Sequence, residues 1–280
     1  MTIFGTQMGG RFYCGAVAFG LAGALALTAL PQAPLQTTAS NPPVAAPRFV
    51  VVLDAAHGGD EVGGQVGASG SAVAEKTLTL ALSVRLRSLL AARGFTVVTT
   101  REGNVNLTGD ARAQIANHAT SGPGGSACLS LHASEAGSGV HIYVSSLAPT
   151  QPTRFLAWKT AQSAYVTRSL KLAGTVNSAL EHTSPRGESE SAAGNSNGGA
   201  IPATLAQASL PGLDSLTCPA VAIEVAPIRT SDRSVATEVT DLQYQTQLVE
   251  ALAAAMLEWK TDWETESGRL TSPSGGGLPK

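Results

Sequence analysis

The stretch RFVVVLD, residues Arg48–Asp54, decides the fold of this chain. A continuous run of β-branched and aliphatic residues is typical of a strand that is buried on both faces of a parallel sheet. A glycine-rich segment, His57–Gly70, follows the run. Residues Glu75–Arg93 then carry leucines at helical spacing, and Gly94 ends that pattern as a helix C-cap does. The segment therefore predicts a strand, a loop and a helix in succession.

The rest of the chain repeats this alternation. Four further strands are predicted at Phe95–Arg101, Ala127–Leu131, Gly139–Ser145 and Pro219–Val225, and three further helices at Asp110–Ala119, Arg154–Glu181 and Asp241–Trp259. Strands that alternate with helices form a mostly parallel sheet covered on both faces. We therefore expect one α/β domain with three layers, whose functional residues lie at the carboxyl ends of the strands.

The two ends of the chain differ in composition from this domain. A single positive charge, Arg11, precedes an uncharged apolar run from residue 12 to residue 30. This pattern predicts a secretory signal peptide or an uncleaved signal anchor over residues 1–33, with a buried N-terminal helix as the alternative. Residues 34–47, rich in Pro, Ser and Thr, are interpreted as a linker to the domain at 48–262.

Two other segments are expected to lack regular structure. Residues 184–199 are rich in Ser, Gly and Asn and predict a mobile loop, and residues 263–280 predict a disordered tail. The formal net charge of −2 gives no basic surface, so no nucleic-acid partner is expected. Cys128 and Cys218 each begin an apparent strand, which leaves open either a disulfide in an exported protein or two buried thiols.

Three side chains suggest a metal site: His57, Glu75 and His132. Two imidazoles and one carboxylate are a recurrent set of catalytic zinc ligands that leaves one coordination position open. His57 and His132 follow or end predicted strands, and the glycine-rich loop can bring Glu75 back towards them. Each residue also has an ordinary structural explanation, because strand-end histidines form hydrogen bonds and a glutamate in the first turn of a helix is favoured by the helix dipole.

Glu224 is the next candidate, because it is the only charged residue of the strand PAVAIEV. A carboxylate in such a strand needs a partner, a metal or a raised pKa. A general base beside a metal-bound water would supply that reason, and a salt bridge to Arg229 is the alternative.

Several motifs, in the same order, resemble those of the zinc-dependent N-acetylmuramoyl-L-alanine amidases. The run VVVLDAAHGG is similar to the strand and Asp-Pro-Gly-His-Gly-Gly turn of that family, and SLHAS is similar to its Ser-Ile-His-Ala-Asn. The other matching segments are Glu75-Lys76, GFTVVTTR, Arg112 with Ala116-Asn117, PAVAIEV and the closing helix DLQYQTQLVEALAAAM. The resemblance covers residues 48–260.

This resemblance implies a fold, an activity and a site. The fold would be a single α/β domain with about six mostly parallel strands. The substrate would be peptidoglycan, cleaved at the amide between N-acetylmuramic acid and the L-alanine of the stem peptide. His57, Glu75 and His132 would bind Zn²⁺, and Glu224 would be the catalytic carboxylate. Asp54 is expected to orient His57 from outside the ligand set.

The resemblance also places the protein in the periplasm or cell envelope of a bacterium, as a monomer that a protein activator could regulate. Asp-Ala-Ala replaces Asp-Pro-Gly before His57, and Val-Ala-Pro replaces Thr-Gly-Phe after Glu224. Two alternative functions are another envelope zinc amidase or peptidase on the same scaffold, and a non-catalytic peptidoglycan-binding regulator. The four filled site positions favour the enzyme.

Overall fold

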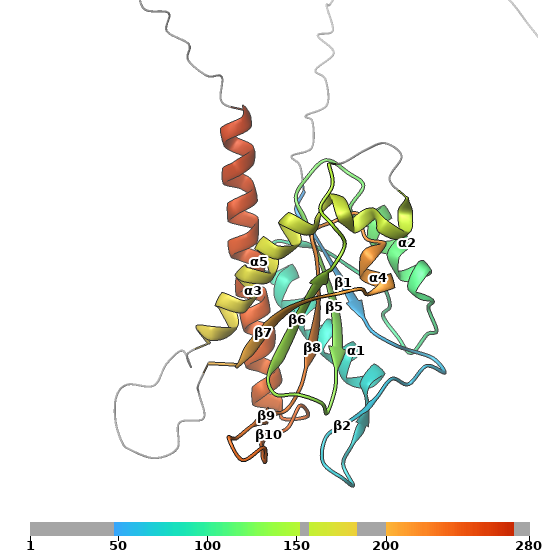
Figure 1. Cartoon of the computed structure of the whole chain (residues 1–280), viewed down its shortest axis with the longest axis vertical. Helices are drawn as coiled ribbons and strands as arrows, with labels where there is room; N and C mark the ends of the chain where they lie inside the picture. Colours follow the sequence, from blue (N-terminus) through green and yellow to red (C-terminus); the bar gives the residue numbers. More distant parts are fainter. Residues whose placement is uncertain (1–47, 152–156, 184–199, 272–280) are drawn as a thin grey trace, which may run out of the picture. The chain divides into compact units, whose positions relative to one another are not determined.

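A six-stranded sheet forms the centre of the computed structural model, which describes residues 48–151, 157–183 and 200–271 (Figure 1). The strand order is β4-β1-β5-β8-β6-β7. The strands are β1 (Val50–Ala55), β4 (Thr96–Thr99), β5 (Ser126–Ala133), β6 (Val140–Ser145), β7 (Ala203–Ala208) and β8 (Ala220–Val225). All neighbours are parallel except β6 and β8, which are antiparallel. The expected six-stranded, mostly parallel sheet is thus confirmed.

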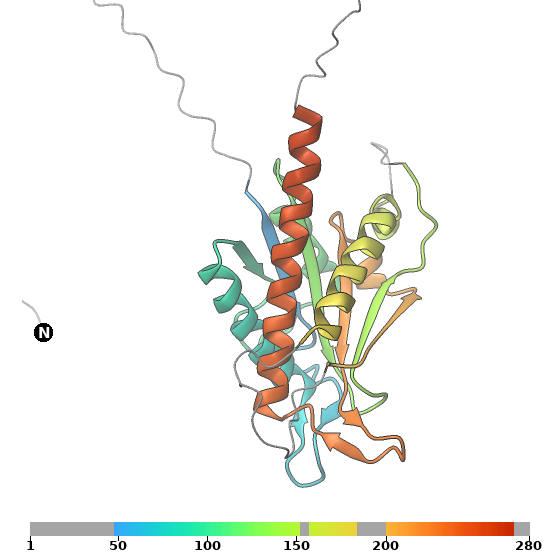
Figure 2. The same cartoon turned by 90° about the vertical axis from the view of Figure 1, so that its left-hand side faces the viewer.

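Helices cover both faces of the sheet. The larger core lies between the sheet and three helices, α1 (Glu75–Ala92), α3 (Val166–Glu181) and α5 (Leu242–Thr271). Figure 2 shows α5 passing between α1 and α3 in front of the sheet. A smaller core on the other face joins the sheet to α2 (Gly109–Ala119) and α4 (Pro211–Asp214). The described residues therefore form the three layers that the sequence predicts.

The alternation of side chains along β1 explains why the two faces differ. Val51 and Leu53 point into the larger core, while Val52 belongs to the smaller one. Asp54 lies two residues after Val52 and therefore on the same face, nearer the carboxyl end of the strand. The face covered by α2 and α4 thus becomes polar towards the carboxyl edge of the sheet.

Two short hairpins stand at that carboxyl edge (Figure 1). The first, β2 (Gln65–Val66) with β3 (Val73–Ala74), leads directly into α1. The second, β9 (Ile228–Arg229) with β10 (Val235–Thr237), follows β8 after two residues. They flank the edge where the candidate site residues lie.

The prediction of one continuous helix over Arg154–Glu181 is wrong in its described N-terminal part. Trp158–Ala164 form a 3₁₀ helix, η1, in which the backbone leaves helical geometry at Thr160, and α3 begins only after Tyr165. The cause is the buried Gln162, whose amide nitrogen donates to the carbonyls of Leu216 and Cys218 at 2.9 and 3.0 Å. These tertiary hydrogen bonds hold the segment against the loop before β8 and override helical propensity.

The prediction of a disordered tail from residue 263 is wrong as far as Thr271, because α5 continues to that residue. Trp263 packs edge-on against Phe49, with ring centroids 5.8 Å apart. Asp262 and Glu266 both pair with Lys171 of α3, at 3.1 and 2.8 Å. These contacts extend the helix beyond the apolar pattern that ends at Trp259.

The sheet also contains β7, an edge strand that the residue pattern did not predict. Its sequence, ATLAQA, is mostly exposed and lacks the alternation of apolar and polar residues that marks a half-buried strand. Its pairing with β6 supplies the sixth strand. The predicted signal or anchor, the linker and the loop at 184–199 lie outside the described residues. Within those that are described, no helix combines the length and the apolar character needed to cross a membrane.

A disulfide joins Cys128 and Cys218, so of the two alternatives for these cysteines the bridge is the observed one. Cys128 lies in β5, and Cys218 stands two residues before β8, the neighbouring strand. Both residues are buried, at 2 % and 0 % exposure. The bond closes a loop of 90 residues and ties together the strands that carry His132 and Glu224.

Replacing both cysteines, as Cys128→Ala with Cys218→Ala, should lower the free energy of unfolding by about 2–5 kcal/mol, because the unfolded chain regains the entropy that the cross-link removes. Urea denaturation followed by circular dichroism measures the difference. Added reductant should destabilise the native protein and leave the double variant unchanged. Equal stability of the two proteins under oxidising conditions would contradict the structural role of the bond.

Candidate metal centre

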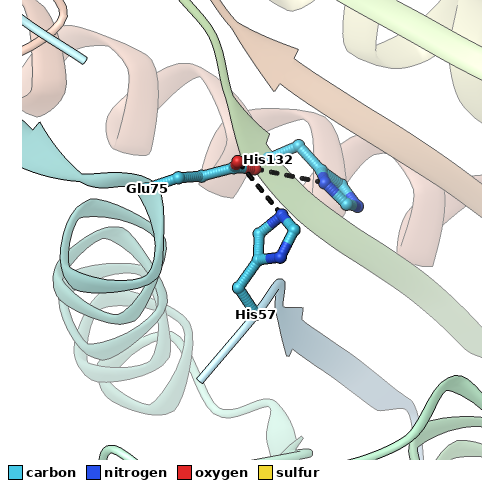
Figure 3. A group of neighbouring side chains, drawn as sticks. All are labelled: His57, Glu75 and His132. Carbon is cyan, nitrogen blue, oxygen red and sulfur yellow. Dashed lines mark ion pairs between the residues drawn. The ribbon is translucent and has the colours of Figure 1, made fainter. Parts of the chain in front are cut away.

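The three predicted ligands converge at the carboxyl edge of the sheet (Figure 3). His57 follows β1, Glu75 is the first residue of α1, and His132 is the penultimate residue of β5. Their nearest ligand atoms all lie within 4.8 Å of one another. His57 Nε2 is 3.0 Å from Glu75 Oε2, and His132 Nδ1 is 3.3 Å from Glu75 Oε1.

Glu75 is the buried member of the group, with 6 % of its surface exposed. Its Oε2 accepts a hydrogen bond from the Gly64 amide at 3.0 Å, and its Oε1 accepts one from the Ala133 amide at 3.1 Å. Burial raises the pKa of this carboxyl, but the hydrogen bond from His132, the two amide donors and the charge of His57 outweigh burial and lower the pKa to about 2. The side chain is therefore an anion in a position that suits a cation ligand.

The glycine-rich segment allows the backbone to pass close to the ligands. At Gly63, which has a φ of 69°, a Cβ atom would lie 2.6 Å from both Glu75 Oε2 and the His57 ring. No other residue fits without moving a ligand. The glycines between His57 and Glu75 thus have a structural reason beyond flexibility.

Two buried arginines hold the turn that carries His57. Arg112 donates to the carbonyl of His57 at 2.5 Å and to that of Ala55 at 2.6 Å. Arg101 donates to the carbonyls of Ala55 and Ala56 at 2.8 and 3.0 Å. These bonds stabilise the left-handed backbone of His57, whose φ of 61° is unfavourable for a residue with a side chain.

Hydrogen bonds from neighbouring side chains orient the two histidines. Glu61 Oε1 lies 3.1 Å from His57 Nδ1, and the Ser130 hydroxyl lies 3.3 Å from His132 Nε2. Ser130 in turn donates to Asp54 at 2.9 Å. The expectation that Asp54 orients the His57 ring is therefore wrong, because Glu61 takes the place beside that ring. Asp54 is linked to His132 through Ser130, and to the backbone of His57 through Arg112.

Thr100 and Arg112 explain this arrangement, because both donate to Asp54 Oδ1, at 2.6 and 2.8 Å, and fix the position of its carboxylate. Glu61 could have been found from the sequence as an acidic residue four positions after a candidate ligand. Ser130 offered the weaker signal of a hydroxyl two positions before His132 on the same strand face.

Glu224 lies on β8 directly beside His132 of β5, in register with it. On its other side, Glu224 is in register with His141 of β6. Side chains in register on adjacent strands share a face and are neighbours. Arg229 does not form the alternative salt bridge within the described part of the chain. Its guanidinium instead donates to the carbonyls of Glu135 and Gly137, at 2.9 and 3.0 Å.

The donor set fits zinc on its chemistry. Each of the two histidines turns one ring nitrogen towards Glu75, while the other nitrogen has a polar partner of its own, as metal-bound histidines usually do. Two nitrogens and one carboxylate leave a fourth tetrahedral position for water or substrate. An arrangement of this kind can activate water beside a free carboxylate and hydrolyse an amide.

Fold and site together define an α/β domain with a His/Glu/His group that could hold a metal ion at the carboxyl edge of its sheet. The model of the N-acetylmuramoyl-L-alanine amidase family matches residues 51–258, so the chain belongs to this family. It is accordingly a peptidoglycan amidase, as the motifs of the sequence imply.

Several solved structures share this fold. The catalytic domain of CwlV from Bacillus (Paenibacillus) polymyxa var. colistinus is 22% identical, with a TM-score of 0.53, over 77% of this chain and 99% of that one. Ami1 from Mycobacterium smegmatis is 21% identical, with a TM-score of 0.53, over 77% and 98%. An N-acetylmuramoyl-L-alanine amidase from Clostridium difficile is 21% identical, with a TM-score of 0.51, over 76% and 96%. No curated protein sequence matches the chain.

Glu61→Gln should weaken zinc binding about 10–100-fold, because the amide is a poorer partner for His57 Nδ1–H than a carboxylate. Competition with a chromogenic chelator measures the affinity. Glu102→Gln, which removes a surface ion pair with Arg87, serves as the control and should leave the affinity unchanged. A Glu61→Gln protein with native affinity would exclude Glu61 as the orienting group.

Gly63→Ala should also reduce zinc affinity, because its methyl group would displace Glu75 or His57. Gly70→Ala is a matched control: Gly70 lies in the same segment with a φ of 93°, but a Cβ there meets nothing within 4 Å. Both variants carry the strain of a positive φ, and only Gly63→Ala adds the clash. Equal zinc affinities of the two variants would show that the close approach at Gly63 is unimportant.

Proposed function

We propose that the chain is a zinc-dependent N-acetylmuramoyl-L-alanine amidase in which His57, Glu75 and His132 bind the metal and Glu224 moves the proton. The observation that carries the proposal is the convergence of three donor atoms within 4.8 Å, next to a carboxylate on the adjacent strand. The family assignment supplies the bond that is cleaved, between N-acetylmuramic acid and the L-alanine of the stem peptide.

When bound, zinc polarises the scissile carbonyl and lowers the pKa of a water ligand to about 7. The proton transfers are carried out by a side chain of the protein. Glu224 accepts the proton of the attacking water and then delivers it to the leaving amide nitrogen. Proton transfer of this kind typically contributes roughly 10²–10⁴ in rate.

The polar network behind the ligands keeps the site in one geometry. Asp54 accepts from Ser130, which contacts His132, while Arg112 bonds both Asp54 and the backbone of His57. A shift of either histidine therefore requires the loss of buried, charge-assisted hydrogen bonds. Such preorganisation is what the attack on a poorly reactive amide requires.

An oxidising location outside the cytoplasm, in the periplasm or cell envelope, accords with this activity. Peptidoglycan lies outside the cytoplasmic membrane, and a buried disulfide forms and persists in oxidising compartments. The apolar run before residue 31 would direct the export.

Glu224→Gln should retain zinc and lose peptidoglycan cleavage by at least about 10²-fold, because the amide cannot accept the proton of water. Release of soluble stem peptides from purified peptidoglycan, identified by mass spectrometry, measures cleavage, and metal analysis measures zinc. Products that begin with free L-alanine identify the amidase rather than a peptidase.

A matched control is Glu181→Gln, which alters an exposed glutamate at the end of α3. It should keep native activity. Full activity of Glu224→Gln would show that another group transfers the proton. Loss of zinc from that variant would instead make Glu224 part of the metal site.

A further inference from the structure

A cavity of about 270 Å³ opens beside the metal centre, between the sheet and the helices α2 and α4. His57 and His132 form part of its wall, so whatever fills the cavity also touches the space next to the metal. The cavity extends from the site towards β1 and down the sheet face. Glu224 is not among its lining residues.

The lining of this cavity is mainly aliphatic. The apolar residues are Val52, Leu107, Ala113, Ala116, Leu129, Leu210, Leu213, Leu216 and Ala222. The carboxylates that reach it are Glu61 and Asp54, and the guanidinium of Arg112 neutralises Asp54 at 2.8 Å. Glu61 is 60 % exposed in its side chain and lies at the opening. The cavity therefore favours an uncharged, partly apolar group and disfavours an anion.

The opposite flank of the metal centre has a different character. Beyond Glu224 lies His141, whose Nδ1 is 2.8 Å from the Thr204 hydroxyl. A second, open hollow next to this flank is lined by Arg229 and Arg233, together with Glu135. Because Arg229 already pairs with Glu135 at 4.0 Å, Arg233 is the surplus cation of this lining, and its charge makes this side attractive to anions.

The two halves of the substrate differ in the same way. The acyl half, next to the scissile carbonyl, is a lactyl group that bears a methyl and is attached to an uncharged sugar. The amine half is a stem peptide that carries free carboxylates. The position of Glu224 sets the direction, because the carboxylate that protonates the leaving nitrogen must face the amine half. Glu224 lies on the β8 side of His132, so the acyl half faces β1 and the cavity.

We propose that the cavity between the sheet, α2 and α4 binds the uncharged acyl half of the substrate, while the stem peptide leaves over β8 and β6, past His141 towards Arg229 and Arg233. This assignment rests on the proposed amidase function and adds to it the orientation of the substrate. It names a specificity pocket for the muramyl side of the bond.

Two glycines at the rim of the cavity allow a direct test. Gly109 begins α2 and Gly212 lies in α4, and at both positions a Cβ would meet nothing within 4 Å. Gly109→Leu and Gly212→Leu therefore add a side chain at the cavity rim from positions where its first carbon meets no neighbour. Gly174→Leu is the matched control, because Gly174 is an exposed glycine of α3 with equally open space around it.

The experiment compares product inhibition in the zinc-loaded full chain. Each rim variant should raise the inhibition constant of N-acetylmuramic acid about tenfold or more, as expected for lost room in an apolar pocket. The carboxylate of this product is the former scissile carbonyl and would face the metal, so that only its uncharged sugar and lactyl methyl enter the cavity. The inhibition constant of the released stem peptide should stay within about twofold. Gly174→Leu should change neither. A second comparison uses Arg233→Ala, which should raise only the constant of the peptide.

Three results would overturn the orientation. The rim variants could raise the inhibition constant of the stem peptide and leave that of N-acetylmuramic acid unchanged, which would show that the substrate binds in the opposite orientation. They could change neither constant, which would show that the cavity binds no part of the substrate. They could raise both constants equally, which would place their effect on the metal centre. Failure of the amidase function itself is distinguishable, because native enzyme would then release no stem peptides from peptidoglycan.

Discussion

Two guanidinium groups buried beneath one turn of backbone are the constraint on which the site depends. Arg101 and Arg112 direct their N–H groups at the carbonyls of residues 55, 56 and 57 as the chain leaves β1. Both arginines are at least nine-tenths buried. Burial, together with the neighbouring charge of Arg112, lowers the pKa of Arg101, and Asp54 opposes that effect. An arginine remains charged even so, and its several donors satisfy carbonyls that have no partner strand.

This constraint acts on the candidate metal site through His57. A residue with a side chain adopts a positive φ only when its surroundings compensate for the cost, which is roughly 1–3 kcal/mol. Here the compensation is the bond from Arg112 to the carbonyl of His57. The same guanidinium binds Asp54, which reaches His132 through Ser130. One buried cation thus fixes both histidines, although they lie on different strands.

Much of this could be predicted from the sequence, because the signals were local. The run VVVL predicts a buried strand, and residues at the ends of such strands meet at one edge, which placed His57, His132 and Glu224 together. The exposed, small residues of β7 give no such signal. Nor could periodicity show that Gln162 bonds a distant loop, or that Thr100, Ser130 and Arg112 draw Asp54 away from His57. These outcomes depend on which donors tertiary packing brings to one acceptor.

The disulfide has a consequence for the continuity of the site. His132 lies four residues after Cys128, and Glu224 lies six residues after Cys218. A protease that cut any peptide bond between these two segments would place His132 and Glu224 on separate polypeptides. The sulfur bridge would still join those pieces where β5 and β8 begin to pair, because Cys128 is the first residue of β5 in that pairing and Cys218 lies two residues before Ala220, its partner in β8. The covalent path from His132 to Glu224 through the disulfide is therefore shorter than the path along the main chain. An enzyme cut between the two segments keeps both residues in one covalently joined molecule.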